Sequence, residues 1–128
     1  MRALHTTRAP AAIGPYSQAA EAGGFLFSAG QIGLDPATGE FAGHDVETQA
    51  EQVCENIRAI LEKAGLSFSD VVKTTVYLAD MDEFPLVNTI YAKHFTEPYP
   101  ARSTVAAAGL PKGARVEIDV IACRSTDR

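Results

Sequence analysis

The stretch Val46–Ala64, VETQAEQVCENIRAILEKA, decides the fold class, because its apolar side chains recur every three or four residues. This spacing places them on one stripe of an α-helix that can pack against a core. Asp45 is a suitable N-cap, and Lys63 and Gly65 supply a cation and a glycine at the C-terminal end. We therefore predict an amphipathic helix over residues 46–64.

A second helix is predicted to begin near Asp80–Asp82, with an apolar side made of Phe84, Val87, Ile90, Tyr91 and Phe95. Pro85 has no backbone N–H, so it is tolerated only in the first turn of a helix. Asp82 as the N-cap meets this condition. We prefer that start to a capping box running from Asp80 to Glu83.

The rest of the chain alternates apolar and polar residues, which is typical of strands. Predicted strands lie near Leu4 and at Tyr16–Ala22, Phe25–Gly30, Val72–Leu78, Ala101–Ala107 and Arg115–Cys123. We expect Phe25–Gly30 to be covered on both faces. Strands grouped around two helices predict one α+β domain over residues 1–128. Its mixed sheet would have about six strands, with both helices on one face.

The last predicted strand raises the question of what covers the other face of the sheet. Glu117, Asp119, Ile121 and Cys123 share that face. A half-polar, half-apolar face on a chain of 128 residues indicates association with other copies.

Composition narrows the function classes. The net charge is −5 and the Lys and Arg residues are scattered, so a nucleic-acid partner is disfavoured. No apolar run approaches the ~18–20 residues that cross a bilayer, and the N-terminus lacks the apolar core of a secretory signal. We expect a cytoplasmic protein without a membrane partner. A short transit peptide is the alternative left open by the acid-free residues 1–20.

Several kinds of site are disfavoured by the spacing of reactive residues. His5, His44 and His94 are isolated, so we expect surface or capping histidines and no metal. Cys54 lies on the apolar stripe of the first helix, where inert packing is the default, and no serine sits in a nucleophile elbow. We expect no cofactor.

Arg102 is the main candidate for a ligand-binding residue. It follows Pro100-Ala101 among small apolar residues, and its planar fork can hold a carboxylate bidentately. Glu117, on a strand expected to be a neighbour, would then stand near the bound molecule. A structural ion pair between Arg102 and Glu117 is the alternative, which spacing alone favours. Tyr16 and Asn88 are weaker candidates, the latter because asparagine is a poor helix former.

At these residues the chain resembles the reactive-intermediate deaminases, also called the Rid or YjgF family. The resemblance runs almost end to end in separate pieces that keep their order. The pieces are Ala9–Gln18, Gly30–Ile32, Asp35–Gly39, Gln49, Asn56, Val72–Tyr77, Val87–Asn88, Tyr91, Pro100–Ser103, Leu110–Pro111 and Val116–Ile118.

The resemblance implies a chorismate-mutase-like fold, a homotrimer, and clefts between adjacent subunits. It implies hydrolysis of 2-iminoacids such as 2-iminopropanoate and 2-iminobutanoate to 2-oxoacids and ammonia, which protects pyridoxal-phosphate enzymes. A non-enzymatic binder of small carboxylates, acting as a metabolic regulator in the same cleft, is the alternative. Endoribonuclease or translation-inhibitor activity is associated with some members, but the acidic composition disfavours it.

Roles for single residues follow from the same resemblance. Arg102 would clamp the substrate carboxylate, and Glu117 would orient or deprotonate the attacking water and return a proton to the leaving nitrogen. Tyr16 would hydrogen-bond substrate or water, and Gly30 would let the backbone approach the ligand. Asn88 would be a hydrogen-bonding residue on the side of the cleft.

The chain departs from the family pattern just before Gly30. Many deaminating members have serine there, whereas this chain has Ala29, with Ser28 one residue earlier. Successive strand residues face opposite sides, so Ser28 should not replace the missing hydroxyl. Thr104 shares the strand face of Arg102 by parity and is expected to line the cleft, at a position where some relatives carry cysteine.

Overall fold

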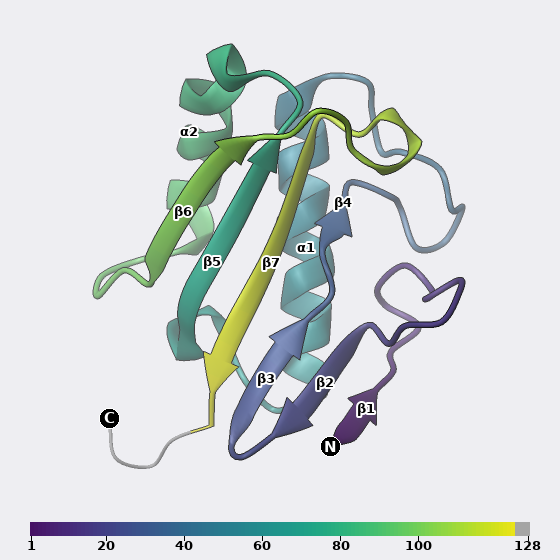
Figure 1. Ribbon diagram of the computed structural model, residues 1–128, viewed down its shortest axis with the longest axis vertical. Helices are drawn as coiled ribbons and strands as arrows, with labels where there is room; N and C mark the ends of the chain where they lie inside the picture. Colours follow the sequence, from purple (N-terminus) through teal and green to yellow (C-terminus); the bar gives the residue numbers. More distant parts are fainter. Residues whose placement is uncertain (125–128) are drawn as a thin grey trace.

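A seven-stranded mixed sheet forms the centre of the structure, a computed structural model that describes residues 1–124 (Figure 1). Its strands are β1 (Arg2–Leu4), β2 (Ala19–Ala22), β3 (Phe25–Ser28), β4 (Gln31–Ile32), β5 (Val71–Leu78), β6 (Ala101–Ala106) and β7 (Val116–Cys123). The order is β1-β2-β3-β7-β5-β6, and β4 pairs with β7 beyond the end of β3. Only β5 and β6 pair in parallel within the described residues. The α+β class and the mixed sheet are confirmed, with the two-residue β4 as the strand that was not predicted.

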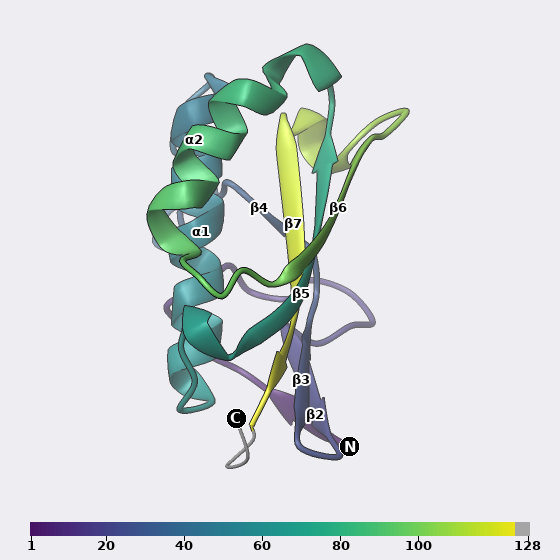
Figure 2. The ribbon, with the colours of Figure 1, turned by 90° about the vertical axis from the view of Figure 1, so that its left-hand side faces the viewer.

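Two helices, α1 (Val46–Lys63) and α2 (Phe84–His94), pack on one face of this sheet and leave the other face open (Figure 2). Short 3-10 turns at Phe68–Asp70, Met81–Glu83 and Pro111–Gly113 join the elements. Neither helix in the described part of the chain is long and apolar enough to cross a membrane.

The start and end of α1 agree with the sequence. The Asp45 side chain accepts a hydrogen bond from the Thr48 backbone N–H at 2.9 Å, which caps the first turn. The helix ends at Lys63, and Gly65 follows with a φ of 76°, the left-handed conformation that glycine adopts readily. Local signals determine both ends, which is why the prediction succeeds.

The predicted start of α2 at Asp82 is wrong. The Asp80 side chain instead accepts from the Asp82 backbone N–H and caps a 3-10 turn. The α-helix itself begins two residues after Asp82, at Phe84, with Glu83 at the N-cap position. Pro85 lies in the first turn, as expected.

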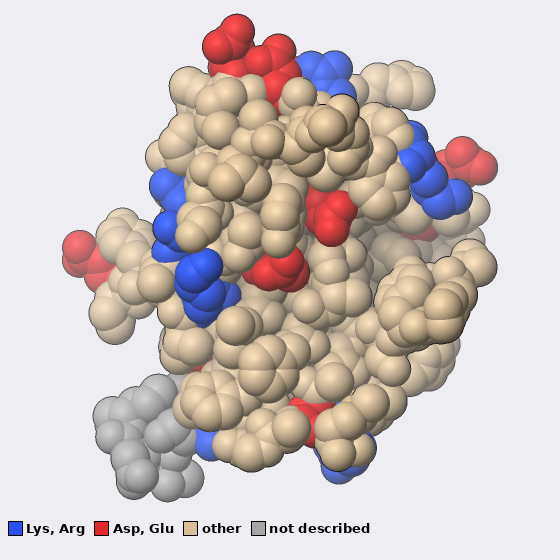
Figure 3. Space-filling model, viewed as in Figure 1, with Lys and Arg blue, Asp and Glu red and all other residues tan. Residues whose placement is uncertain are grey.

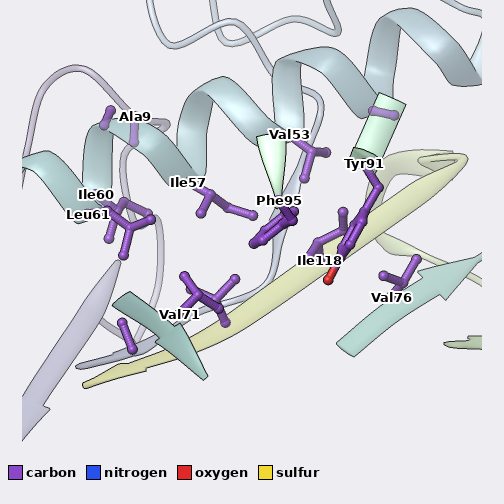
Figure 4. Packing of buried hydrophobic residues seen from close by; sticks show 14 of the residues in the cluster. Ala9, Val53, Ile57, Ile60, Leu61, Val71, Val76, Tyr91, Phe95 and Ile118 are labelled. Atoms are coloured by element: carbon purple, nitrogen blue, oxygen red, sulfur yellow. The ribbon is translucent and has the colours of Figure 1, made fainter. Parts of the chain in front are cut away.

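The core lies between the helices and the covered face of the sheet (Figure 4). Helix α1 contributes Val53, Ile57 and Ile60, and β5 and β7 contribute Val76 and Ile118, all of them fully or almost fully buried. Each such side chain stabilises the fold by about 1.5–3 kcal/mol relative to an exposed one. On β7 buried and half-buried residues alternate, as the period of two predicts.

Asn56 is the buried polar residue through which α1 holds the loop after β4. Its side-chain amide donates to the carbonyls of Ile32 and Leu34 at 3.2 and 2.9 Å, and the residue is fully buried. Both carbonyls follow the Gly30-Gln31 segment, so Asn56 fixes the end of β4 against α1.

Replacing Asn56 with leucine should destabilise the protein by about 2–4 kcal/mol, because two carbonyls lose their donor. The measurement is urea unfolding at neutral pH. Gln52→Ala is the matched control, since Gln52 donates one bond to Asn56 on the same helix. Equal unfolding midpoints for the two variants would contradict this role.

Two predicted strands differ from the structure. Strand β2 begins only at Ala19, and Tyr16 lies in the preceding loop, which the Gln18 side-chain amide holds through the Thr6 and Pro10 carbonyls. Strand β3 is not covered on both faces: Phe25 and Phe27 are 41% and 45% exposed on the open face. Figure 3, which looks onto this face, shows acidic groups surrounded by uncharged surface.

Candidate functional site

Glu117 lies on the open face of the sheet, near the start of β7. It is opposite Ile32 of β4 and Tyr77 of β5. Its carboxyl group passes directly over Gly30, where a Cβ atom would come within 2.8 Å of the Glu117 Cδ. Glycine is therefore required at position 30 for the close approach, not for an unusual φ.

A bulge in the sheet creates this approach. Phe27 pairs with Ile121 and Gln31 pairs with Ile118, so the chain from β3 to β4 has one residue more than β7 between these pairs. An extra residue bends the strand and redirects its side chains. Ala29 and Gly30 lie at this bulge, between β3 and β4.

The Ser28 hydroxyl is used inside the sheet. It accepts a hydrogen bond from the Val120 backbone N–H at 3.0 Å, where the regular ladder between β3 and β7 is interrupted. Ser28 therefore does not present its hydroxyl in place of the serine that Ala29 lacks, as the alternation of strand residues predicted.

An open cavity of about 570 Å³ lies beside Glu117. Three separate segments and Glu117 itself line it: Pro10–Gln18 in part, Ala29–Leu34 in part, and Pro111 with Lys112. Tyr16, Ala29 and Gly30 are all in this lining, so the structure brings four of the predicted site residues together.

Gln18 holds the loop that carries Tyr16. Its side-chain amide donates to the carbonyls of Thr6 and Pro10 at 2.9 and 2.8 Å, and its carbonyl accepts from the Thr6 N–H. Gln18 is 2% exposed. Its own backbone carbonyl accepts from the Ala29 N–H at 2.8 Å, so one residue joins the Tyr16 loop to the bulge.

Two carboxyl groups on this face titrate above their ordinary range. Burial raises the pKa of Glu117, and the negative charge of Asp119 raises it further. Burial also raises the pKa of Asp119, against a hydrogen bond from Tyr77 at 3.2 Å and the nearby Lys73 charge. A glutamate with a raised pKa is a stronger base than an ordinary glutamate, and beside a cavity it is suited to accept a proton from a bound molecule or water.

Arg102 lies elsewhere, on the edge strand β6. Its Nη1 donates to Asn88 Oδ1 at 2.7 Å, and its guanidinium carbon lies 4.7 Å from the centre of the Tyr91 ring and 5.1 Å from that of Phe84. It borders a second cavity of about 400 Å³ together with Asn88, Tyr91 and Tyr99.

Arg102 also differs from the other arginines in its charge partners. Within residues 1–124 every other arginine forms an ion pair with a carboxylate: Arg2, Arg8, Arg58, Arg115 and Arg124. Arg102 has no carboxylate within ion-pair distance in the same part of the chain, and Asn88, which accepts its hydrogen bond, is neutral. An exposed guanidinium beside a cavity without a counter-charge is suited to bind an anion.

The expectation that Arg102 and Glu117 lie on neighbouring strands is wrong. Strand β5 separates β6 from β7. Arg102 pairs with the fully buried Thr74 and faces α2, whereas Glu117 faces the open side. The two side chains of one chain are therefore on opposite faces of the sheet, which also removes the structural ion pair between them as an explanation of either residue.

Thr104 is half-buried and shares the face of Arg102, since it pairs with Val76 as Arg102 pairs with Thr74. Asn88 contacts Arg102 directly. The predicted residues thus divide into two half-sites: Tyr16, Ala29, Gly30 and Glu117 on one side, and Asn88, Arg102 and Thr104 on the other.

His94 is not the surface or capping residue that was expected. Its side chain is 7% exposed and lies between two helix residues: Arg58 Nη2 is 3.1 Å from Nδ1, and Glu51 Oε1 is 2.8 Å from Nε2. Arginine only donates, so Nδ1 is the acceptor and Nε2 carries the proton that Glu51 accepts. His5 and His44 are exposed.

Glu51, Glu55 and His94 could geometrically converge on a cation, since their ligand atoms lie within 4.8 Å of one another. A metal at Nε2 would require the other tautomer, which would turn an N–H toward the Arg58 guanidinium. The geometry therefore favours a polar network that joins α1 to α2. Cys54, on the same helix, is buried, and burial followed by the Glu51 charge raises its pKa to about 12, so it is an inert thiol.

Gln18, Asn56, Tyr91 and Lys112 are the site-supporting residues that residue-by-residue reasoning did not single out. Gln18 and Asn56 act through backbone carbonyls distant in sequence, and Lys112 lines the Glu117 cavity with a left-handed φ of 57°. Gln18, Asn56 and Tyr91 are parts of the family resemblance, whereas Lys112 is not among its pieces.

Known proteins resemble this chain over nearly its whole length. The family model described as Endoribonuclease L-PSP matches residues 6–124. A RutC family protein of Pyrococcus horikoshii is 54% identical over 119 residues, which cover 93% of this chain and 94% of that protein. The 2-iminobutanoate/2-iminopropanoate deaminase of Mus musculus is 48% identical over 121 residues, covering 94% and 90%.

A solved structure shows the same likeness. The crystal structure of E. coli TdcF with bound serine has a TM-score of 0.92 and 44% sequence identity, and the match covers 98% of this chain and 100% of that one. The chain therefore belongs to the reactive-intermediate deaminase family, also called the Rid or YjgF family, which the Endoribonuclease L-PSP model describes.

Proposed function

We propose that the protein hydrolyses reactive 2-iminoacids, such as 2-iminopropanoate and 2-iminobutanoate, to 2-oxoacids and ammonia. The observation that carries the proposal is the pair of complementary half-sites. Arg102 offers a cation without a carboxylate partner in residues 1–124, and Glu117 offers a carboxyl group with a raised pKa beside a cavity. The name of the mouse relative supports this activity.

The two half-sites require a second copy to form one site. Because Arg102 and Glu117 of one chain lie on opposite faces, we propose that Arg102 of one subunit completes the Glu117 cavity of its neighbour in a homotrimer. The open sheet face supports this assembly, since Phe25, Phe27 and Val105 are each more than 40% exposed there. Exposed aromatic and aliphatic side chains grouped on one face are typical of an interface.

The chemistry needs neither a metal nor a covalent nucleophile. Arg102 would bind the substrate carboxylate and hold the imine carbon near Glu117. Glu117 would accept a proton from water as the water oxygen bonds to that carbon. This proton would pass to the nitrogen, and the second water proton would follow it as the carbon–oxygen double bond forms and the carbon–nitrogen bond breaks, so that the nitrogen leaves as ammonia. Water is the only other reactant. Removing the imine would protect pyridoxal-phosphate enzymes from attack on their cofactor.

A coupled assay tests the activity. A threonine dehydratase generates 2-iminobutanoate, semicarbazide traps it, and the semicarbazone signal is followed with and without the protein. Faster imine loss, unchanged by EDTA, is expected. An unchanged semicarbazone signal together with measurable 2-oxobutanoate binding would instead support a small-carboxylate binder, for which the serine bound to E. coli TdcF is the precedent.

The pH dependence should follow Glu117. The base form must be unprotonated, so kcat/KM is expected to fall as the pH falls through the raised pKa of Glu117. Asp119→Asn removes the negative charge that adds to the effect of burial on the pKa of Glu117. The fall in kcat/KM on the acid side should therefore move to lower pH. Glu117→Gln should abolish this fall together with most activity. Asp82→Asn, an exposed carboxylate outside the sheet, is the control. If kcat/KM of Asp119→Asn falls at the same pH as that of the parent, a group other than Glu117 titrates.

Ala29→Ser tests the missing hydroxyl. Ala29 lines the Glu117 cavity, so serine would add a hydrogen-bonding group there. We expect kcat to rise roughly two- to tenfold, because one well-placed hydrogen bond to a developing charge has about this effect or more. Ala11→Ser adds a hydroxyl to the lining of the same cavity and is the matched control. A rate equal to the parent's would mean that backbone groups and Arg102 suffice.

A further inference from the structure

Tyr91 of α2 connects the hydrophobic core to Arg102. It is 6% exposed, and its ring lies in the core beside Phe95, with the ring centres 4.2 Å apart and the planes nearly parallel (Figure 4). The guanidinium carbon of Arg102 lies over the same ring, 4.7 Å from the ring centre. Tyr91 thus places a rigid aromatic surface beneath a flexible, exposed cation.

The Tyr91 ring is itself fixed. Its hydroxyl lies 2.9 Å from the hydroxyl of Thr74, which is fully buried on β5. Thr74 is also the residue that pairs with Arg102 across the β5–β6 ladder. The ring that supports the guanidinium and the backbone that carries it are therefore anchored at the same residue.

The surroundings of Arg102 orient it without neutralising it. Tyr91 and Phe84 offer ring faces, and Asn88 accepts one N–H at 2.7 Å. A guanidinium has five N–H donors in a fixed fork, so donors remain for an incoming carboxylate. Cation–π contacts hold the plane of the fork while its charge stays available to a ligand.

We propose that Tyr91 is a positioning residue for Arg102, with its ring orientation locked by Thr74. The consequence for ligands rests on the proposed function, in which Arg102 binds the substrate carboxylate. A free arginine loses side-chain entropy when it binds a ligand, whereas one held in place has lost much of it on folding. Tyr91 therefore acts on carboxylate affinity and has no part in the chemical step.

The matched pair of variants is Tyr91→Leu and Phe95→Leu. Both remove a buried aromatic ring from the same stack at the end of α2, but Phe95 is not among the rings that the Arg102 guanidinium contacts. Three readouts apply: the NMR order parameter of the Arg102 Nε–H group, assigned with Arg102→Ala; the affinity for 2-oxobutanoate; and KM separately from kcat.

In Tyr91→Leu the Arg102 Nε–H group should become mobile, and 2-oxobutanoate affinity should fall roughly tenfold. KM should rise by about the same factor while kcat stays within about twofold, because a uniform binding contact is lost. Phe95→Leu should leave all three close to the parent. The proposal is overturned if the Arg102 order parameter in Tyr91→Leu equals that of the parent. Equal losses of order and of 2-oxobutanoate affinity in Tyr91→Leu and Phe95→Leu would overturn it as well.

A folding defect does not remove the test. If Tyr91→Leu does not fold, the double variant Tyr91→Phe/Thr74→Val removes the hydroxyl pair without leaving an unpaired partner. The double variant should lower the order parameter of the Arg102 Nε–H group measurably, and an order parameter equal to the parent's would overturn the proposal. The Arg102 order parameter also tests the positioning role of Tyr91 independently of imine hydrolysis. A protein without imine hydrolysis contradicts the proposed function, while the order parameter still decides whether Tyr91 positions Arg102.

Discussion

Co-expression of Arg102→Ala and Glu117→Gln in equal amounts should restore about one quarter of parental imine hydrolysis, although each variant alone is inactive. The reason is the placement of the two residues on opposite faces of one sheet. A site shared between neighbours needs Glu117 from one subunit and Arg102 from the next. Random mixing supplies both in about one site of four.

The loss in the single variants should be large. Removing a general base costs about 10²–10⁴-fold in rate. Removing Arg102 takes away the carboxylate contact and the near-attack geometry that it provides. The measurement is the semicarbazone assay on the co-expressed assemblies without selection, beside each variant alone. Assemblies that carry both variants, purified through two different affinity tags, should show about one third, because every mixed trimer has one complete site of three.

A second mixture distinguishes a shared site from one within a single chain. The double variant Arg102→Ala/Glu117→Gln, co-expressed with the parent in equal amounts, leaves about one quarter of the sites intact if they are shared and about half if they are not. Mixed single variants without any recovered activity, together with the half-active second mixture, would place the whole site in one chain and contradict the proposed assembly.

The sequence predicts the local features of this fold well. The Asp45 cap, the apolar stripe of α1 and the alternation along β7 all depend on residues a few positions apart. The separation of Ser28 from the missing hydroxyl also follows from alternation, and the structure adds its physical cause, the bond from Val120.

Features set by distant residues were harder to predict. Nothing near Arg102 in sequence reveals that β5 lies between β6 and β7, because strand order depends on how the α2 crossover returns to the sheet. The position of Tyr16 in a loop depends on Gln18 contacts with Thr6 and Pro10. The structure therefore shows what the sequence alone does not, that Arg102 and Glu117 of one chain lie apart, and their role in a site stays a prediction.

Gly30→Ala should reduce kcat about 10²-fold or more while the fold is kept. A Cβ at position 30 would lie 2.8 Å from Glu117 Cδ and 3.1 Å from its Cγ, so the Glu117 side chain must move. That side chain is flexible and half-exposed, and φ at Gly30 is outside the left-handed region, so the stability cost is small. The expected change in unfolding free energy is within about 1 kcal/mol.

The Gly30→Ala variant keeps Glu117 but displaces its side chain, so it tests whether the position of the carboxyl group matters. Gly109→Ala is the matched control, because a Cβ there meets nothing within 4 Å and its φ is also ordinary. The measurements are kcat from the semicarbazone assay and the urea midpoint for both variants. Carboxylate binding by Arg102 is untouched, so 2-oxobutanoate affinity in Gly30→Ala should stay within about threefold of the parent, apart from crowding by one methyl group. If kcat of Gly30→Ala equals that of the parent, catalysis does not need the Glu117 carboxyl group at its position over Gly30. That result would contradict the proposed role of the bulge.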